Sequence, residues 1–231
     1  MIPARMALAE SRNAVAIWLA GEIGIASVLR TARSLGIKTP LQPYVTTALG
    51  ASEVNLMELA NAYRTMASGI LAQPYVIRKI ERNPRQMVAE KSEHPSSPVP
   101  VEGFALLLIQ EGMRGVVRLP TGTAHALDST GFPIAVMGKT GTTNDFRDAL
   151  FVGSTYGPAG ITIAVRIGFD DNRSLGAGET GARVALPVFK EIALRVYAEK
   201  LVGPAPRFPA EMEQSINDYL GGGVVKTIAQ R

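Results

Sequence analysis

The residue types with the greatest chemical potential lie in one short polar segment that follows an apolar stretch. The segment combines a lysine and three threonines with two glycines and reads Gly138-Lys139-Thr140-Gly141-Thr142-Thr143. Lysine supplies a cation, and threonine hydroxyls can hydrogen-bond a carboxylate. Glycine removes side-chain bulk, so a ligand can approach the backbone. The pattern predicts the ligand-facing end of a strand, and an ordinary polar turn between strands is the competing interpretation.

A second segment with chemical potential lies near the start of the chain. Ser11-Arg12-Asn13 follows a short helical run and places a hydroxyl and a carboxamide two residues apart. Taken alone, Ser11 is better interpreted as a helix cap. The same S-x-N spacing recurs at Ser215-Ile216-Asn217, but after the lysine segment rather than before it. Order along the chain therefore favours Ser11 as the partner of the downstream lysine segment.

The lysine segment also fits the end of a phosphate-binding loop. The motif G-x-x-x-x-G-K-[ST] requires a glycine at position 133, where this chain has Pro133. It also requires a helix directly after the lysine, whereas residues 145–152 read as a turn and a strand. A nucleotide site is therefore disfavoured.

Composition narrows the class of protein. The 231 residues are 46% hydrophobic and 19% charged, which is typical of a globular chain with a sizeable core. The sequence has no cysteine and only His94 and His125 as imidazoles, so we expect no metal and no thiol nucleophile. We also expect no cofactor. The absence of cysteine does not fix the cellular compartment.

Charge and hydropathy argue against two kinds of partner. The net charge is +4, but the basic residues of the first 50 positions are dispersed singly, with few aromatic residues between them. The most apolar early stretch, residues 14–20, is far shorter than the ~20 residues needed to cross a bilayer. We therefore expect no nucleic-acid partner and no membrane segment, and we find no readable export signal in this chain.

Several helices must support these polar segments. Apolar residues at helical spacing predict helices over residues 25–35 and 184–196, and a third that includes residues 104–109 and ends near Gly115. A fourth helix is predicted between Asn55 and Gly69, with Asn55 and Glu58 forming a reciprocal cap.

The remaining elements are short and extended. Residues 134–137, 149–152 and 161–167 predict a three-stranded antiparallel meander, across which the last helix should lie. Residues 75–80 and 86–88 predict a surface hairpin, and the proline-rich stretch 92–100 predicts a loop. Beyond residue 200, prolines and a glycine run predict an irregular tail over residues 201–231.

Together, these motifs make the chain similar to a known family. It resembles the transpeptidase domain of penicillin-binding proteins, in particular the bifunctional high-molecular-weight class A type. The resemblance runs from about residue 7 to residue 197. The segments that carry it are Ser11-Arg12-Asn13, residues 49–63, Gly122-Thr123-Ala124, and residues 139–145, 148–153 and 168–172. It implies an α+β fold, in which an antiparallel sheet is packed by helices beside a largely helical subdomain, with residues 1–200 forming a partial transpeptidase domain.

The resemblance also implies a site for acyl transfer from the D-alanyl-D-alanine stem peptide of peptidoglycan, or from the β-lactams that mimic it. Ser11 would relay a proton to the leaving amine, Asn13 would hydrogen-bond the substrate amide, and Lys139 would supply positive charge. The substrate-binding residues would be Thr140, Gly141 and Thr142. The two hydroxyls would bind the terminal carboxylate, and the Thr142 N–H would form half of an oxyanion hole.

One departure from the family is decisive for activity. These enzymes attack with the serine of an S-x-x-K motif, and no serine in this chain has lysine three residues later. We therefore expect a C-terminal part of a transpeptidase that is inactive alone. A D,D-carboxypeptidase or β-lactamase-like hydrolase, and a non-catalytic remnant that acts as a binding module, remain alternatives. The family works outside the cytoplasmic membrane to which it is anchored, whereas this chain shows neither export signal nor anchor.

Overall fold

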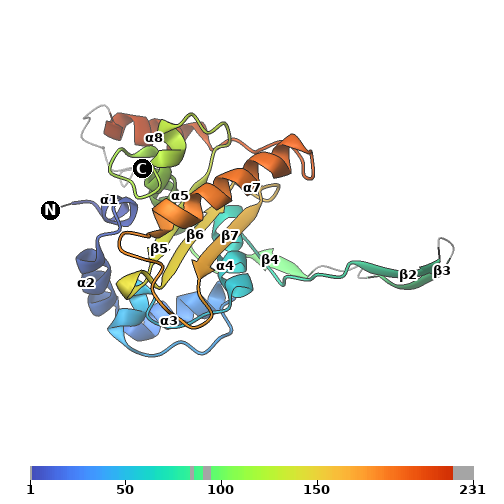
Figure 1. Cartoon of the computed structure of the whole chain (residues 1–231), viewed down its shortest axis with the longest axis horizontal. Coiled ribbons are helices and arrows are strands. Elements are labelled where there is room, and N and C mark those ends of the chain that lie inside the picture. The colour runs from blue at the N-terminus through green and yellow to red at the C-terminus, as the bar shows by residue number, and fades with distance from the viewer. Residues whose placement is uncertain (1, 84–85, 91–94, 221–231) are drawn as a thin grey trace.

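The structure, a computed structural model, describes residues 2–83, 86–90 and 95–220. It is an α+β arrangement in which helices pack on an antiparallel sheet, as predicted (Figure 1). A slender two-stranded arm projects away from this body. His94, one of the two imidazoles of the sequence, lies outside the described residues.

The three-stranded meander is confirmed, but its first strand lies further along the chain than predicted. Strands β5 (Met137–Thr142), β6 (Asp148–Ser154) and β7 (Thr162–Gly168) pair antiparallel in the order β5-β6-β7. The first strand was predicted over residues 134–137, but it begins at Met137 and runs through the lysine segment. The reason is that residues 137–142 each find a partner on β6, so pairing continues past the last apolar side chain.

Helices cover both faces of this sheet. Helix α7 (Leu186–Ala198) lies across one face, as predicted, and has its proline in the first turn. Phe189 of α7 meets Phe151 of β6 edge to face, with 4.8 Å between ring centroids. Helices α4 (Leu56–Ser68) and α5 (Gly103–Arg118) lie behind the sheet and contact β7 and β5, respectively.

The predicted cap of α4 is only half correct. The Asn55 side chain accepts a hydrogen bond from Met57 N at 2.8 Å, and Gly69 ends the helix in the left-handed region. Glu58 does not reach back to Asn55. Its carboxylate instead accepts from the backbone N–H groups of Lys38 and Thr39 and from the Thr39 hydroxyl, which ties the preceding loop to the helix.

The N-terminal part is helical. It consists of α1 (Ala4–Ala9), α2 (Asn13–Ile23), α3 (Ile25–Ser34) and the short helix η1 (Val45–Leu49). The helix predicted over residues 25–35 is confirmed as α3. Among the described residues, no single helix has both the length and the hydropathy of a membrane span; α2 and α3 satisfy that test only as a pair bent by 97°.

The predicted hairpin forms the projecting arm, but its first strand begins at Lys79 rather than at residue 75. It consists of β2 (Lys79–Asn83) and β3 (Gln86–Glu90), paired antiparallel. The predicted loop over residues 92–100 is partly wrong, because β4 (Ser96–Pro98) pairs with β1 (Ile70–Ala72) at the base of the arm. Residues 91–94 of that loop lie outside the described residues.

Helix α5 is longer than predicted, and the chain after it turns back sharply. The helix passes Gly115, where a shift to loop was expected, and ends at Arg118. A Cβ on Gly115 would meet the Leu119 and Ala9 side chains at 3.3 and 3.6 Å, so this glycine allows close packing of α1 rather than a helix end. The short helices α6 (Ala126–Ser129), η2 (Asn144–Phe146) and η3 (Gly181–Ala185) complete the body.

The region expected to be an irregular tail contains a helix. Helix α8 (Ala210–Leu220) packs on α5, and residues 221–231 lie outside the described part. Phe208, Met212 and Ile216 recur every four residues and are 7%, 3% and 3% exposed. This single apolar stripe explains the helix, because it can be buried against the core even though glycines and prolines surround it.

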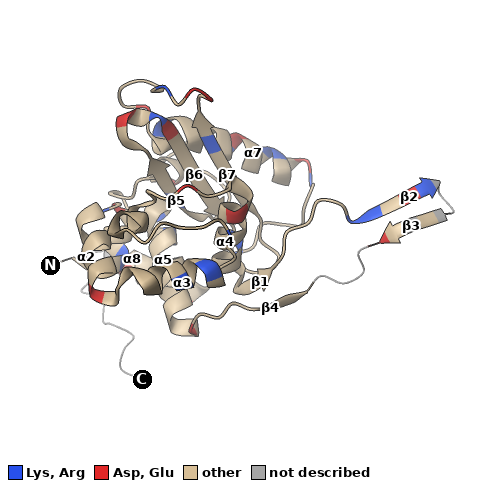
Figure 2. Cartoon of the chain, turned by 90° about the horizontal axis from the view of Figure 1, so that it is seen from below, with Lys and Arg blue, Asp and Glu red and all other residues tan. Residues whose placement is uncertain are grey.

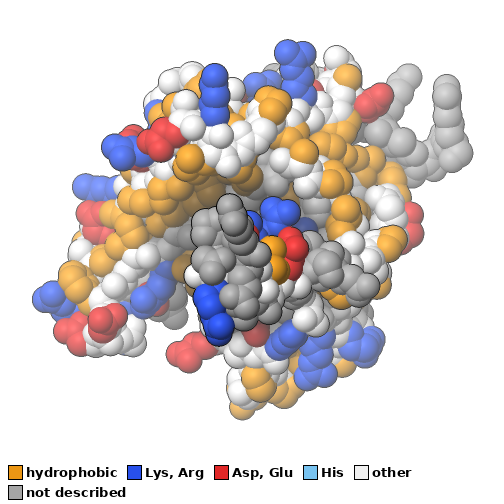
Figure 3. Space-filling view, turned by 90° about the vertical axis from the view of Figure 1, so that its right-hand side faces the viewer, with side chains coloured by type: hydrophobic (Ala, Val, Ile, Leu, Met, Phe, Trp, Pro, Cys, Tyr) orange, Lys and Arg blue, Asp and Glu red, His pale blue; other side chains and the backbone are white. Residues whose placement is uncertain are grey.

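The surface shows mixed charge and some apolar exposure. Basic and acidic residues are interspersed over helices and sheet rather than gathered on one face (Figure 2). The face from which the arm projects carries hydrophobic side chains between charged ones (Figure 3). At the root of the arm, Val76 and Ile77 are 88% and 64% exposed.

Candidate active site

The structure brings the two polar segments of the sequence together. Lys139 lies in the middle of β5, and its Nζ donates a hydrogen bond to Ser11 Oγ at 2.8 Å across a separation of 128 residues. The same ammonium donates to the Thr140 carbonyl at 3.0 Å. The alternative interpretations, a helix cap for Ser11 and a polar turn for Lys139, do not describe these contacts.

Burial changes the acid–base character of Lys139. Removing part of its water shell lowers the pKa of its ammonium from 10.5 to about 8. A lysine with this pKa holds a proton at neutral pH and releases it more readily than an exposed lysine does. Such a group can pass a proton to a neighbouring hydroxyl.

Ser11 occupies an unusual backbone conformation. It follows the end of α1, with its own N–H bonded to Leu8 O and the next N–H, of Arg12, bonded to Ala7 O. Its φ is +55°, the left-handed region that such helix ends normally fill with glycine. A side chain there costs about 1 kcal/mol. The turn nevertheless aims the Ser11 hydroxyl at Lys139.

Asn13 lies at the first turn of α2, two residues beyond Ser11. Asn13 is exposed, and its side chain takes part in none of the polar contacts found within the described residues. The structure therefore does not bring Asn13 into contact with Ser11 or Lys139. Its carboxamide is open to a ligand.

Thr140 contacts Thr123, a residue that was not assigned to the site from the sequence. Its Oγ1 is 2.6 Å from Thr123 Oγ1, and the Thr123 N–H is bonded to the carbonyl of Ala9 at the end of α1. Thr123 thus connects β5 with the helix that leads to Ser11. The signal that could have found it is the segment Gly122-Thr123-Ala124, which contributed to the family resemblance without receiving a role.

Thr142 and Gly141 lie beside Gly181, which was not assigned to the site from the sequence. Thr142 Oγ1 accepts a hydrogen bond from Gly181 N at 3.0 Å. A Cβ on Gly181 would lie 2.2 Å from Leu150 O and 2.5 Å from Gly141 O, so only glycine allows this approach. A Cβ on Gly141 would meet no backbone but only the Leu150 side chain, at 3.3 Å.

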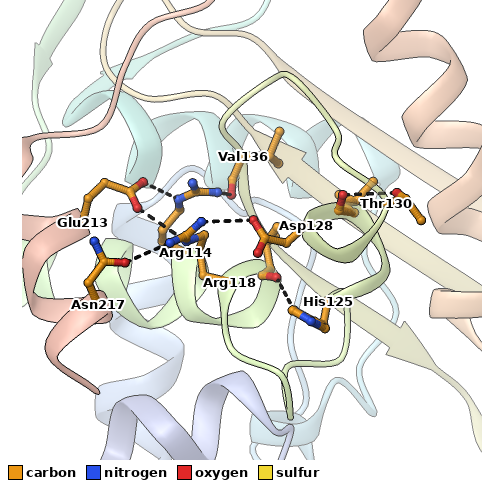
Figure 4. Close-up of polar contacts among 10 residues, drawn as sticks. Arg114, Arg118, His125, Asp128, Thr130, Val136, Glu213 and Asn217 are labelled. Carbon is orange, nitrogen blue, oxygen red and sulfur yellow. Dashed lines mark hydrogen bonds and ion pairs between the residues drawn. The ribbon is translucent and has the colours of Figure 1, made fainter. Parts of the chain in front are cut away.

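The second S-x-N segment has a different environment. Ser215 Oγ donates to Glu111 at 2.7 Å. Asn217 Oδ1 accepts from Arg118 at 2.9 Å (Figure 4). Ile216 between them is buried in the core. Both polar residues are therefore contacts between α8 and α5, in agreement with the order argument that set this segment aside.

The described residues offer no metal centre. No group of three or more His, Asp or Glu side chains within them is placed to hold an ion. The described histidine, His125, has its Nδ1 3.2 Å from Val117 O, a contact with the backbone of α5.

Comparison with known proteins defines the class. The family model described as the penicillin binding protein transpeptidase domain matches residues 1–194. The chain therefore belongs to the penicillin-binding protein transpeptidase family.

Within this family, the chain is similar to penicillin-binding protein 1A of several bacteria. It is 34% identical to that of Aquifex aeolicus over 205 residues, which are 84% of this chain and 26% of the relative. It is 30% identical to that of Neisseria gonorrhoeae over 223 residues, 94% of this chain and 27% of the relative. The chain thus spans about a quarter of the length of these curated relatives.

Solved structures support the fold. Penicillin-binding protein 1A from Haemophilus influenzae superposes with a TM-score of 0.75 at 22% identity, covering 89% of this chain and 35% of that one. Penicillin-binding protein A from M. tuberculosis, solved as an imipenem acyl-enzyme complex, gives 0.68 at 18% identity over 84% of this chain and 47% of that one.

Proposed function

We propose that this chain supplies the Ser11 and Lys139 side of a peptidoglycan D,D-transpeptidase site. The observation that carries the proposal is the 2.8 Å contact between Lys139 Nζ and Ser11 Oγ. It joins the S-x-N segment and the lysine segment, two of the segments on which the family resemblance depends. The matched domain and the similarity to penicillin-binding protein 1A support it. We place its substrate, the D-alanyl-D-alanine stem peptide, outside the cytoplasmic membrane.

The chemistry assigned to the site is acyl transfer. A nucleophilic serine gives its proton to the lysine of its own S-x-x-K motif and adds to the carbonyl of the penultimate D-alanine. The peptide bond breaks, and the terminal D-alanine leaves with a proton on its nitrogen. The Ser11 hydroxyl donates that proton and recovers one from the Lys139 ammonium, whose low pKa suits the transfer. An acceptor amine then attacks the acyl carbon and returns a proton through Ser11 to Lys139. The serine leaves with the proton held by the S-x-x-K lysine, which restores the starting state.

The remaining residues position the substrate. Strand β5 is an edge of the sheet within the described residues, so an extended peptide can pair with it as an added strand. The Thr140 and Thr142 hydroxyls bind the terminal carboxylate, the Thr142 N–H receives the developing oxyanion, and Asn13 binds the peptide amide. Gly141 keeps the strand open to substrate.

The nucleophile is not among these 231 residues, which hold no S-x-x-K. We therefore expect that fluorescent penicillin leaves no covalent label on the chain, while unlabelled penicillin reversibly shifts the amide NMR signals of β5. Lys139→Ala should abolish those shifts. Lys190→Ala, which removes a lysine of α7 bonded to Thr130, should not. A covalent band blocked by excess unlabelled drug would contradict this assignment.

The missing motif also favours a second candidate, a non-catalytic binding module. A segment containing S-x-x-K from a penicillin-binding protein 1A relative, added in trans, separates the two. A transpeptidase part should promote penicillin labelling of that segment, with loss of labelling in Lys139→Ala. A binding module should bind penicillin yet promote none. Release of D-alanine without cross-linked product would instead indicate a carboxypeptidase.

A further inference from the structure

Helix α8 makes several polar contacts with α5, and two of them continue to an element that carries or adjoins a site residue. These two contacts involve Glu111 and Arg114, which are three residues apart and so lie on one side of α5. On α8 they involve Glu213 and Ser215. Helix α8 lies beyond residue 194, where the match to the family ends.

The first contact leads to Lys139. Arg114 Nε donates to Glu213 at 2.8 Å, and its Nη1 donates to the Val136 carbonyl at 2.8 Å (Figure 4). Val136 directly precedes β5, three residues before Lys139. The Arg114 side chain is only 8% exposed, and its guanidinium lies 4.8 Å from the Phe208 ring centroid. One buried cation thus links α8 to the start of β5.

The second contact leads to Ser11. Glu111 Oε1 accepts from Ser215 Oγ and from Arg5 Nη1, each at 2.7 Å. Arg5 belongs to α1, and Ser11 follows the end of that helix by two residues. The Glu111 side chain is 7% exposed. A second buried charge therefore links α8 to the helix that presents Ser11.

Glu213 has a further electrostatic role. Its second oxygen lies 3.6 Å from Arg118 Nε, so one carboxylate lies against two guanidinium groups. Burial already lowers the pKa of Arg114, and the Glu213 charge counteracts that effect. Without Glu213, Arg114 would lose its ion-pair partner and lie beside Arg118, with the Asp128 carboxylate, 3.2 Å from Arg118, as the remaining opposite charge. We expect the hold of Arg114 on the Val136 carbonyl to weaken.

We infer that α8 is a positioning element that holds the end of α1 and the start of β5 in the register that sets the distance between Ser11 and Lys139. Glu213 and Ser215 are positioning residues and touch neither reacting group. This inference rests on the proposed function only in treating Ser11 and Lys139 as site residues. The contacts exist whether or not the chain takes part in acyl transfer.

The test follows Lys139 in the intact chain through the 13C signal of its Cε, assigned by its loss in Lys139→Arg. The double variant Glu213→Gln with Ser215→Ala should raise the titration midpoint from about 8 toward 10.5, because a loosened β5 gives the ammonium more water. A matched control, Glu191→Gln with Ser34→Ala, removes an exposed ion pair and a hydroxyl contact elsewhere and should leave the midpoint unchanged.

A midpoint equal to that of the wild type in the double variant overturns the inference, even if thermal stability falls. Should the double variant not fold, Ser215→Ala alone removes one hydroxyl contact and should give a smaller rise; no rise would likewise overturn it. Glu213→Asp, which keeps the charge, should stay closer to the wild type than Glu213→Gln. If the double variant shifts the Lys139 midpoint but the chain fails every penicillin-binding test, the positioning role of α8 is supported and only the proposed function is contradicted.

Discussion

At the scale of single residues, the site combines two features that stability alone would not favour. Ser11 keeps a side chain in a left-handed conformation suited to glycine, and Lys139 keeps an ammonium in a half-buried position. Each costs free energy, and the two meet at 2.8 Å. Such costs concentrate where a protein holds groups ready for a ligand.

The buried ammonium predicts a pH dependence of stability. The pKa of Lys139 is about 8 in the folded chain and 10.5 when exposed, so the unfolded state binds more protons between these values and stability rises with pH there. From pH 7 to pH 9.5 this gain should reach about 2 kcal/mol. Burial raises the pKa of Tyr63 to about 12, which opposes the trend only above its ordinary value of 10.0.

Urea unfolding at the two pH values measures this gain. Lys139→Met, which has no charge to bury, should lose it, whereas Lys190→Met on α7 should retain it. An equal gain in Lys139→Met and the wild type would show that another group is responsible. The comparison within each variant cancels effects of the substitution that do not depend on pH.

At the scale of elements, β5 is shaped by its glycines as much as by its polar side chains. A Cβ on Gly138 would lie 2.4 Å from Val152 O and 3.0 Å from the Gly153 Cα, both backbone atoms of β6. Gly141, three residues further along the same strand, would meet only the Leu150 side chain. The first position is fixed by strand pairing, and the second leaves room for adjustment.

This difference predicts unequal effects of the same change. Gly138→Ala should destabilise the fold by about 2 kcal/mol or more, because backbone must move to admit the methyl group. Gly141→Ala should cost less than about 1 kcal/mol, because the Leu150 side chain can shift. Thermal unfolding of the two variants tests the order. Equal losses, or a larger loss at Gly141, would contradict the assigned strand register.

At the scale of the whole molecule, the body and the arm differ in how much surface they bury. The body shares one core that includes Phe151, Phe189 and Ile216. On the arm, Ile80 and Met87 are each 48% exposed, and the strands pair with each other rather than with the sheet of the body. The arm therefore contributes little hydrophobic stabilisation to the fold.

Replacement of residues 79–90 by a short Gly/Ser linker tests this division. We expect the thermal midpoint to stay within about 4 °C of the parent chain, since surface changes away from the core cost roughly 0.5 kcal/mol. The Lys139 titration midpoint should also be unchanged. A loss of cooperative unfolding would show instead that the arm belongs to the folding unit.

Much of the architecture could be predicted from local patterns. Helix α4 lies between Asn55 and Gly69 because a side-chain cap and a left-handed glycine are local signals. The capping role of Glu58 was wrong because the loop at Thr39 offers its carboxylate more donors than Asn55 does. Helix α8 was missed because its apolar stripe becomes decisive only when a core is present to bury it.

The sequence by itself determined the family motifs, their order and the functional groups that Ser11 and Lys139 carry, because residue type and spacing are set by the chain. Motif order already favoured Ser11 as the partner of Lys139, but only the tertiary structure decided the contact itself. It alone brought Thr140 to Thr123 and Glu213 to Arg114. These contacts join residues far apart in the chain, and no local pattern encodes their distances. Packing of α1, α5, α8 and β5 around a shared core sets them.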